Sequence, residues 1–340
     1  MWKEFEINPK FLDDENIIAK LHLVAQLEKS DPYASKDTNN TPLIERIREA
    51  LVYVPKEYQQ YVLAVFANVI YLPKKFSHSV LWYLLDQVLA KYDTSKNNFV
   101  QQSLFLEVDP TGMINNFIRY NNIPGRLDKG TFQRTQQVSP FVKTANKFLD
   151  GYSFPGEENV LPWLDKKFWV ILTDNALSGT SLCSDLERLI ELTKKANKNP
   201  EFIILARALT STAKKEIEKL KISKLSIETG LFLDEKYVIS EETKDKCCLF
   251  KNVDTKDGVL AACKWLADSD IYKYDKNIED HKSNSGDDLR YGFKKCGLTL
   301  VASENCPSNS LPLLWYRNYN LYEAPFPRVL SRIGGEKKSC

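Results

Sequence analysis

The stretch FWVILTDNALSGTSLCSDLERL, Phe168 to Leu189, joins three local patterns. Phe168 to Leu172 is an uninterrupted apolar run, as in a strand that is buried on both faces. A turn of small and polar residues follows, and apolar residues then recur at three- and four-residue spacing, as on one face of a helix. Strand, turn and helix in this order predict an α/β fold with a mainly parallel sheet.

The composition limits the class of protein. A chain of 340 residues is long enough for two domains or one elaborated domain. Hydrophobic residues make up 43% of it and charged residues 27%, which is typical of a soluble globular protein. Because 47 basic residues face 45 acidic ones, direct nucleic-acid binding is disfavoured.

The seven cysteines contain no CxxC pair, so we expect a reduced, cytoplasmic protein. The first residues, MWKEFEINPKFLDDEN, carry charges throughout and have no apolar signal core. No window reaches the length of apolar sequence that a membrane span needs, so we expect no membrane partner. The three histidines lie far apart, which argues against a histidine metal cage or a Ser-His-Asp site.

The chain changes character near residue 100. Before it, Pro42 begins one helical pattern, and the apolar segments Tyr58 to Leu72 and Ser79 to Tyr92 continue as two more, so residues 1–100 are predicted to be an all-helical N-terminal region. Residues 101–330 alternate strand and helix patterns and are predicted to form the α/β domain, followed by a flexible tail at 331–340.

The α/β region contains five predicted strands and four predicted helices. The strands are Ser103 to Val108, Phe168 to Leu172, Phe202 to Leu205, Leu225 to Glu228 and Leu298 to Ala302. The helices are Gly112 to Tyr120, Leu182 to Ala196, Thr212 to Lys219 and Gly258 to Ala267.

Two long polar segments interrupt this alternation. Residues 121–165, rich in glycine and proline, are predicted to be a disordered insertion or a mobile loop beside a site. Asp268 to Asp288 is a second predicted loop; its last two residues, Asp287 and Asp288, suit either a metal or a solvated acidic pair.

The turn after Leu172 suits a ribose phosphate. Backbone amides at a helix N-terminus favour a phosphate, and Gly179 allows close approach. The hydroxyls of Ser178, Thr180 and Ser181 could donate to the phosphate, although such residues also serve as ordinary helix caps. Asp174 would repel a phosphate unless it contacts another part of the ligand, and ribose hydroxyls are natural partners for a carboxylate.

The same turn resembles the signature of type I phosphoribosyltransferases: a hydrophobic strand, an acidic pair, two small aliphatic residues, then Ser/Thr and Gly positions. The matching residues are Thr173, Asp174, Asn175, Ala176, Leu177, Ser178, Gly179, Thr180 and Ser181. The order of the surrounding parts is also similar, because a short loop follows an earlier strand and a long segment separates it from the signature. That short loop is Asp109, Pro110, Thr111 and Gly112.

The C-terminal third resembles the bacterial PRTase-CE domains, which are proposed to act as effectors in anti-phage defence. The resemblance rests on an Asn-x-Pro-x-Asn segment, a Leu-Pro-Leu-Leu-Trp run and the Pro-rich YEAPFPR. It implies candidates for the base or acceptor side of a ligand site, Asn305, Pro307, Asn309 and Trp315, and Arg207 is a further candidate because it lies just after the predicted strand Phe202 to Leu205. Arg207 could instead be a solvated or capping residue, and Pro307 and Trp315 a rigid turn with a packed indole.

The resemblance implies a role for each part. Asp174 would be the catalytic residue, whose carboxylate accepts hydrogen bonds from the ribose hydroxyls. The amides of 175–181 would hold the 5-phosphate of phosphoribosyl pyrophosphate (PRPP), and 109–112 would face its pyrophosphate. Mg²⁺ would enter with that pyrophosphate, and a lid within 121–165 would exclude water. Two departures weaken the match, since Thr173 replaces an acid and Asp109 adds one beside the pyrophosphate.

Two functions follow. The first is a transferase-like effector that binds PRPP or a related ribonucleotide and transfers a ribosyl phosphate or alters nucleotides. The second is a non-catalytic nucleotide sensor or scaffold, whose residues 1–100 dock a defence-system protein or nucleoprotein. Cys183 lies on the apolar stripe of the following helix, where packing is expected rather than nucleophilic chemistry.

Overall fold

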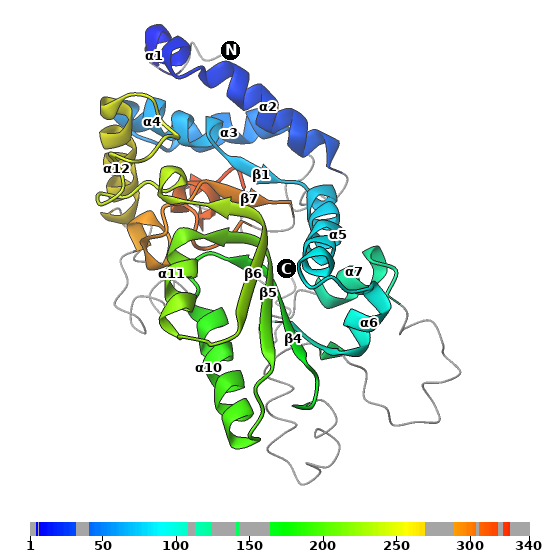
Figure 1. Ribbon diagram of the computed structural model, residues 1–340. Coiled ribbons are helices and arrows are strands. Elements are labelled where there is room, and N and C mark those ends of the chain that lie inside the picture. The colour runs from blue at the N-terminus through cyan, green and yellow to red at the C-terminus, as the bar shows by residue number, and fades with distance from the viewer. Residues whose placement is uncertain are drawn as a thin grey trace, which may run out of the picture. The chain divides into compact units, whose positions relative to one another are not determined.

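A computed structural model describes residues 5, 7–31, 41–107, 113–123, 141–142, 164–268, 289–303, 306–318 and 322–326. The chain divides into two compact units (Figure 1). Unit 1 combines Met1–Lys75 with Glu235–Cys340, and unit 2 is the continuous stretch Phe76–Asp234. The residue-100 boundary expected from the sequence lies inside unit 2.

Unit 2 is built on a five-stranded sheet in which every neighbouring pair is parallel, as the sequence predicts. In spatial order its strands are β3 (Phe141–Val142), β2 (Ser103–Glu107), β4 (Phe168–Ala176), β5 (Glu201–Thr210) and β6 (Leu225–Leu233). The predicted strands at 103, 168, 202 and 225 are thus confirmed as its core.

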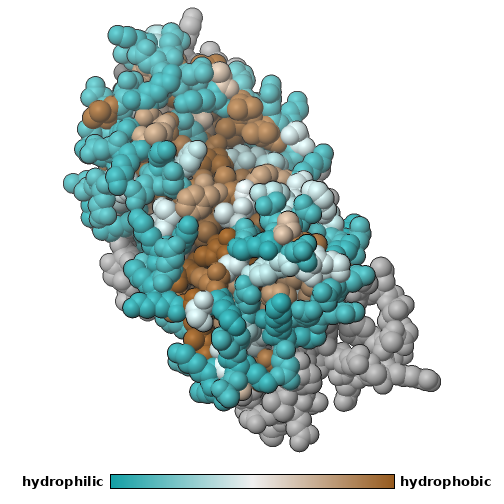
Figure 2. All heavy atoms as spheres, in the orientation of Figure 1, coloured by the Kyte–Doolittle hydropathy of each residue, from teal (hydrophilic) through white to brown (hydrophobic). Residues whose placement is uncertain are grey.

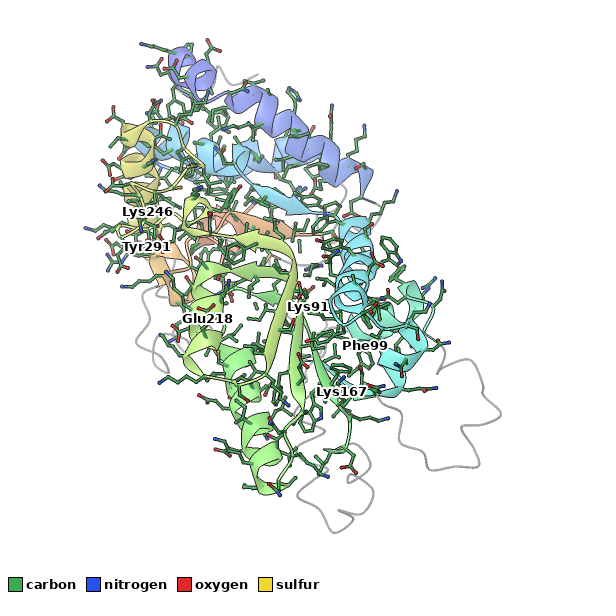
Figure 3. All side chains as sticks on the ribbon, in the orientation of Figure 1. Lys91, Phe99, Lys167, Glu218, Lys246 and Tyr291 are labelled. Atoms are coloured by element: carbon green, nitrogen blue, oxygen red, sulfur yellow. The ribbon has the colours of Figure 1, made fainter. Side chains whose placement is uncertain are left out.

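Helices cover both faces of this sheet (Figure 1). One face carries α5 (Lys74–Lys91), α6 (Lys96–Gln101) and α7 (Met113–Tyr120), and the other carries α10 (Thr180–Lys195) and α11 (Ser211–Lys219). Because side chains alternate along a strand, Trp169 packs toward α10 and α11, while Phe168 packs on the opposite face against Phe99, which is labelled in Figure 3. The continuous apolar run therefore contributes side chains to the hydrophobic cores on both faces of the sheet.

Unit 1 is mainly helical. Its helices are α1 (Pro9–Asp14), α2 (Ile17–Ser30), α3 (Leu43–Val52), α4 (Lys56–Ala67), α12 (Val253–Asp268) and α14 (Pro312–Trp315), with 3₁₀ turns η3 (Glu235–Tyr237), η4 (Leu289–Tyr291) and η5 (Phe293–Lys295). It also holds the parallel pair β1 (Ile70–Leu72) and β7 (Leu300–Ala302), and the antiparallel pair β8 (Arg317–Asn318) and β9 (Tyr322–Glu323).

The segment Tyr58 to Leu72 is not one helix, as its apolar pattern predicts, but a helix and a strand. The α4 helix ends at Ala67, and the Asn68 side chain donates a hydrogen bond of 2.8 Å to the carbonyl of Ala64. The chain then continues as β1, in register with Leu300 of β7 at Ile70. The strand expected near 298–302 therefore pairs with β1 and not with the five-stranded sheet.

A buried carboxylate joins the two chain segments of unit 1. Glu15 is fully buried and accepts hydrogen bonds of 3.1 Å from the backbone N–H groups of Lys251 and Asn252, and one of 3.0 Å from the Thr255 hydroxyl. These donors lie at the start of α12, where a helix leaves N–H groups unsatisfied and favours negative charge.

Several predicted features lie outside the described residues. They are most of the 121–165 loop, the acidic pair Asp287 and Asp288, and the 331–340 tail. None of the helices in the part that the structure does describe is long and apolar enough to cross a membrane. Figure 2 shows that the visible face is largely polar and that a strip of hydrophobic side chains crosses it.

Candidate functional site

The carboxyl ends of β2 and β4 form the candidate site. From β2 the chain moves to β3 on one side, and from β4 it moves through β5 and β6 on the other. The strand order therefore reverses between β2 and β4, which is where open parallel sheets bind ligands. The predicted loop after β2, Asp109 to Gly112, lies outside the described residues, so the structure describes the β4 side only.

The turn after β4 requires a glycine. Gly179 is the N-cap of α10 and has a φ of 78°, a left-handed conformation that other residues rarely adopt. A Cβ at this position would lie 3.0 Å from the Cα of Ala213 in α11. The backbone of the turn thus packs directly against the neighbouring helix.

Thr210, the last residue of β5, fixes this turn. Its hydroxyl donates a hydrogen bond of 2.5 Å to the carbonyl of Leu177 and accepts one of 3.0 Å from the backbone N–H of Ala213. The same side chain therefore caps α11 and holds the loop that opens α10. Sequence reasoning missed this residue, although a threonine between a strand and a helix is a recognisable N-cap.

The N-terminus of α10 suits an anion. This helix has 16 residues, and no side chain caps it at Gly179. Thr180 and Ser181 are exposed and Ser178 is half-buried, with the Thr180 N–H lying 3.4 Å from the Ser178 hydroxyl oxygen. Hydroxyls and the positive end of a helix dipole are thus accessible together.

Asp174 is held by a buried arginine. The Nη2 atom of Arg207 lies 2.8 Å from Asp174 Oδ2, and the Asn175 side-chain amide donates to the same oxygen at 2.9 Å. Arg207 is only 5% exposed, so the alternative that it is a solvated residue is wrong. Adjacent parallel strands carry the acid and the arginine, since Thr173 pairs with Ala206 and Asn175 with Ala208.

Two further polar groups lie at the end of β4. The Oδ1 atom of Asn175 is buried and has no hydrogen-bond partner among the described residues. Thr173, in the place of the first acid of the signature, is buried in the sheet. The described end of β4 thus presents one carboxylate and one amide oxygen, beside a positive charge.

The candidates in unit 1 have partners within their own segment. The Trp315 indole N–H donates 2.8 Å to the Ser310 carbonyl, and the Asn309 side-chain amide donates 3.2 Å to the Phe293 carbonyl. Pro307 accepts a bond of 3.0 Å from the Ser310 N–H, and Asn305 lies outside the described residues. These contacts form a local packed turn, and a ligand role for it stays a prediction.

Cys183 packs as expected against the apolar cluster that α10 shares with the sheet. Burial, reinforced by the nearby Glu216 and Glu187, raises the pKa of its thiol to about 11. A protonated thiol is a poor nucleophile, so this residue adds no chemistry to the site.

Metal ligands are not grouped in the part of the chain that the structure describes, where no cluster of three or more His, Cys, Asp or Glu side chains occurs. Asp174, already paired with an arginine, does not by itself offer the set of oxygens that Mg²⁺ requires.

The model of one protein family, described as PRTase-CE, matches residues 53–328 of the chain. The match begins before α4 and so includes helices that the sequence pattern assigns to a separate region. Comparisons with curated proteins and with solved structures gave no significant match.

Proposed function

Because the chain belongs to the PRTase-CE family, we propose that it binds PRPP or a related ribonucleotide at the carboxyl end of β4. The observation that carries this proposal is the glycine turn at Gly179, which opens a long helix beside the reversal of strand order. A phosphate on this turn would meet the helix N-terminus and the hydroxyls of Ser178, Thr180 and Ser181. The amides from Asn175 to Ser181 would complete its cradle.

The ribose would lie against Asp174 and Asn175. The Asp174 side chain is 29% exposed, so a ligand can reach it while Arg207 fixes its position from within the sheet. Ribose hydroxyls would donate to the carboxylate and to the buried Asn175 Oδ1, whose lack of a partner among the described residues supports this placement. The pyrophosphate would extend toward residues 109–112, and Mg²⁺ would arrive with it.

Transfer of the ribosyl phosphate would break the bond from the anomeric carbon to pyrophosphate and form a bond from that carbon to an acceptor nucleophile. Such a reaction depends on positioning and on stabilising the positive charge that develops on the ribose. One carboxylate beside a guanidinium supplies little net negative charge for this purpose. The Arg207–Asp174 pair therefore favours a second candidate, a nucleotide sensor that binds without turnover.

The cellular role that we propose is an effector or sensor in bacterial anti-phage defence, acting in the cytoplasm. It rests on the resemblance of the C-terminal segment and on the family. In the sensor form, residues 1–100 would dock the defence-system protein or nucleoprotein that transmits the signal.

Titration calorimetry tests the site. PRPP with Mg²⁺ is titrated into the wild type, into Asp174→Asn, and into Glu187→Gln, a matched control that removes an exposed carboxylate farther along α10. We expect wild type and control to bind alike and Asp174→Asn to bind at least about tenfold more weakly, the effect of losing about 1.4 kcal/mol.

An assay for pyrophosphate, with mixed nucleobases as acceptors, then separates the two candidates. Pyrophosphate released by the wild type identifies a transferase, and binding without release identifies a sensor. A wild type that shows no heat with millimolar PRPP would overturn the proposed site.

A further inference from the structure

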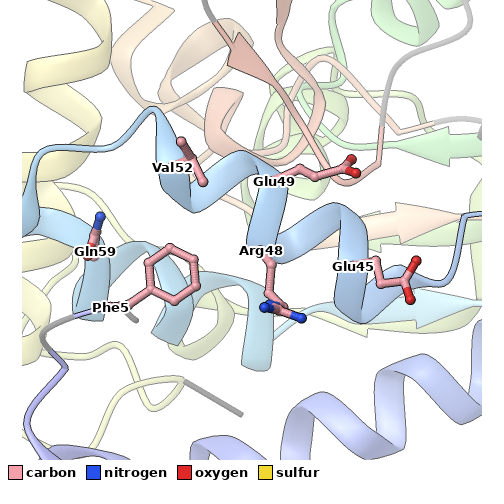
Figure 4. Close-up of a pocket in the computed structure, with 6 residues that line it drawn as sticks. All are labelled: Phe5, Glu45, Arg48, Glu49, Val52 and Gln59. Carbon is pink, nitrogen blue, oxygen red and sulfur yellow. The ribbon is translucent and has the colours of Figure 1, made fainter. Parts of the chain in front are cut away.

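Unit 1 contains a pocket of about 650 Å³ whose lining comes from α3, α4 and the segment before α1 (Figure 4). In that view Phe5 lies on one side of α3, and Glu49 and Val52 lie on the other. Because these side chains do not converge on one space, they do not define a ligand. In unit 2, by contrast, two hydrogen bonds of Thr210 fix the direction of a peptide group in the turn before α10.

The Thr210 hydroxyl is used in both directions. The residue is 2% exposed, and its hydroxyl donates 2.5 Å to the Leu177 carbonyl and accepts 3.0 Å from the Ala213 N–H. A hydroxyl has one proton and a backbone N–H can only donate, so the direction of both bonds is fixed. The Leu177 carbonyl is thereby tied to the end of β5 and the start of α11, which lies beside α10 (Figure 1).

The direction of the Leu177 carbonyl determines where the next amide points. The peptide bond between Leu177 and Ser178 is trans and planar, so its C=O and its N–H point in opposite directions. Since the C=O faces Thr210, the Ser178 N–H faces away from it. Ser178 is half-buried, and its N–H has no acceptor among the described residues. This N–H is therefore available to a ligand on the turn.

We propose that Thr210 is a positioning residue of this turn, an inference that rests on the function proposed above. Its hydroxyl holds the Leu177 carbonyl on the α11 side, so that the Ser178 N–H donates to the phosphate of the ligand. Without this hydrogen bond the peptide group is free to rotate, and a carbonyl oxygen that faces a phosphate repels it. Thr210 acts through Leu177 and Ser178 and does not itself contact the ligand.

The test is titration calorimetry of PRPP with Mg²⁺ on the full-length chain. The wild type is compared with Thr210→Val, which keeps the shape but lacks the hydroxyl, and with Thr210→Ser, which restores it. Should Thr210→Val not fold, Thr210→Ala takes its place, because the smaller side chain leaves room for a water beside the Leu177 carbonyl.

Thr193→Val is the matched control. Thr193 is also buried, and its hydroxyl donates 2.8 Å to the carbonyl of Ile190, but this bond lies within α10 and far along the helix from Gly179. The control therefore removes a bond of the same kind without altering the turn.

We expect Thr210→Val to bind PRPP at least about tenfold more weakly than the wild type, the effect of losing about 1.4 kcal/mol. Thr210→Ser should bind within about threefold of the wild type, and Thr193→Val should bind as the wild type does.

The outcomes separate this inference from the proposed function. Binding by Thr210→Val within about twofold of the wild type would overturn the role of Thr210 and leave the proposed site intact. An equal loss in Thr193→Val, or no recovery in Thr210→Ser, would also overturn it, because the loss would then come from general stability or from packing. A wild type that does not bind PRPP would overturn the proposed function, and the role of Thr210 with it.

Discussion

At the scale of single residues, the arginine beside Asp174 is the feature with the largest consequences. The acid is part of a recognisable signature, and its place at the end of a strand was predictable from the apolar run before it. Its partner was not, because Arg207 is 33 residues away and meets Asp174 only through the register of β4 and β5. Sequence patterns locate strands well but do not set which residues lie opposite one another.

Arg207→Met should destabilise the protein by about 1–3 kcal/mol, because it leaves Asp174 without its buried counter-charge. We place this below the cost of breaking a fully buried pair because the Asp174 side chain is 29% exposed. Urea unfolding measures the change. In the double variant Asp174→Asn/Arg207→Met much of the loss should be recovered, and simple addition of the two single effects would contradict the coupling.

Gly179→Ala should cost about 1–2 kcal/mol from its left-handed backbone alone, with a further cost from its contact with Ala213. Ala213→Gly removes part of that contact but not the backbone strain. We therefore expect the double variant Gly179→Ala/Ala213→Gly to be destabilised relative to Ala213→Gly, again by urea unfolding. Equal stability of these two would show that the turn tolerates a side chain.

Cys183 should react slowly with iodoacetamide at pH 8, because its pKa of about 11 leaves little thiolate. The exposed Cys248 should react first. Mass spectrometry of digested protein can follow both sites, with a fully unfolded sample as the control in which their rates converge. Faster labelling of Cys183 than of Cys248 in the folded protein would contradict the assigned burial.

At the scale of elements, the long sequence patterns predicted their helices and strands correctly, whereas the short patterns did not. Four strands of the main sheet and the helices between them follow from apolar runs and helical spacing. The three-residue strand β1 could not be predicted in this way, because its apolar residues continue the helical spacing of apolar residues in α4. Asn68 followed by Val69, Ile70 and Tyr71 is in hindsight a helix end before a strand-forming run. The pairing of β7 with β1 was also not predictable, because local sequence patterns do not determine which distant strands pair.

Glu15→Ala should destabilise unit 1 by about 2–4 kcal/mol, because it leaves several buried donors at the start of α12 without an acceptor. Glu15→Gln keeps the shape but turns one acceptor into a donor, and should cost less. Circular dichroism during urea unfolding measures both. The neighbouring acid Asp14 is exposed, so Asp14→Ala should have little effect; equal losses at 14 and 15 would contradict the capping role.

At the scale of the whole molecule, two buried tyrosines of unit 1 predict alkaline sensitivity. Burial, together with Asp31 near Tyr71 and Glu241 near Tyr291, raises the pKa of both phenols. The unfolded chain loses these protons near pH 10, about the ordinary tyrosine pKa, whereas the folded chain keeps them. The contribution of the two tyrosines to the free energy of unfolding is therefore fully present below about pH 10 and is lost as the pH rises further.

Above about pH 10 the free energy of unfolding should fall by up to about 1.4 kcal/mol per pH unit for each tyrosine. Urea unfolding at a series of pH values above 9 measures it, and Tyr291→Phe should flatten the curve. Tyr53→Phe, at an exposed position, is the control and should leave the slope unchanged. A wild type as stable at pH 11.5 as at pH 9 would contradict the prediction.

The pairing of Ile70 with Leu300 has a consequence for how the chain is made. A ribosome releases residues in order, so the continuous stretch Phe76–Asp234 emerges complete while the first 75 residues still lack the β7 strand and the α12 helix that they pack against. The apolar surface of α4 therefore stays exposed to solvent until α12 and β7 have been synthesised. During that interval the nascent protein would be a substrate for chaperones. A truncation before residue 300 would leave the five-stranded sheet of unit 2 folded and unit 1 incomplete, with apolar surface exposed.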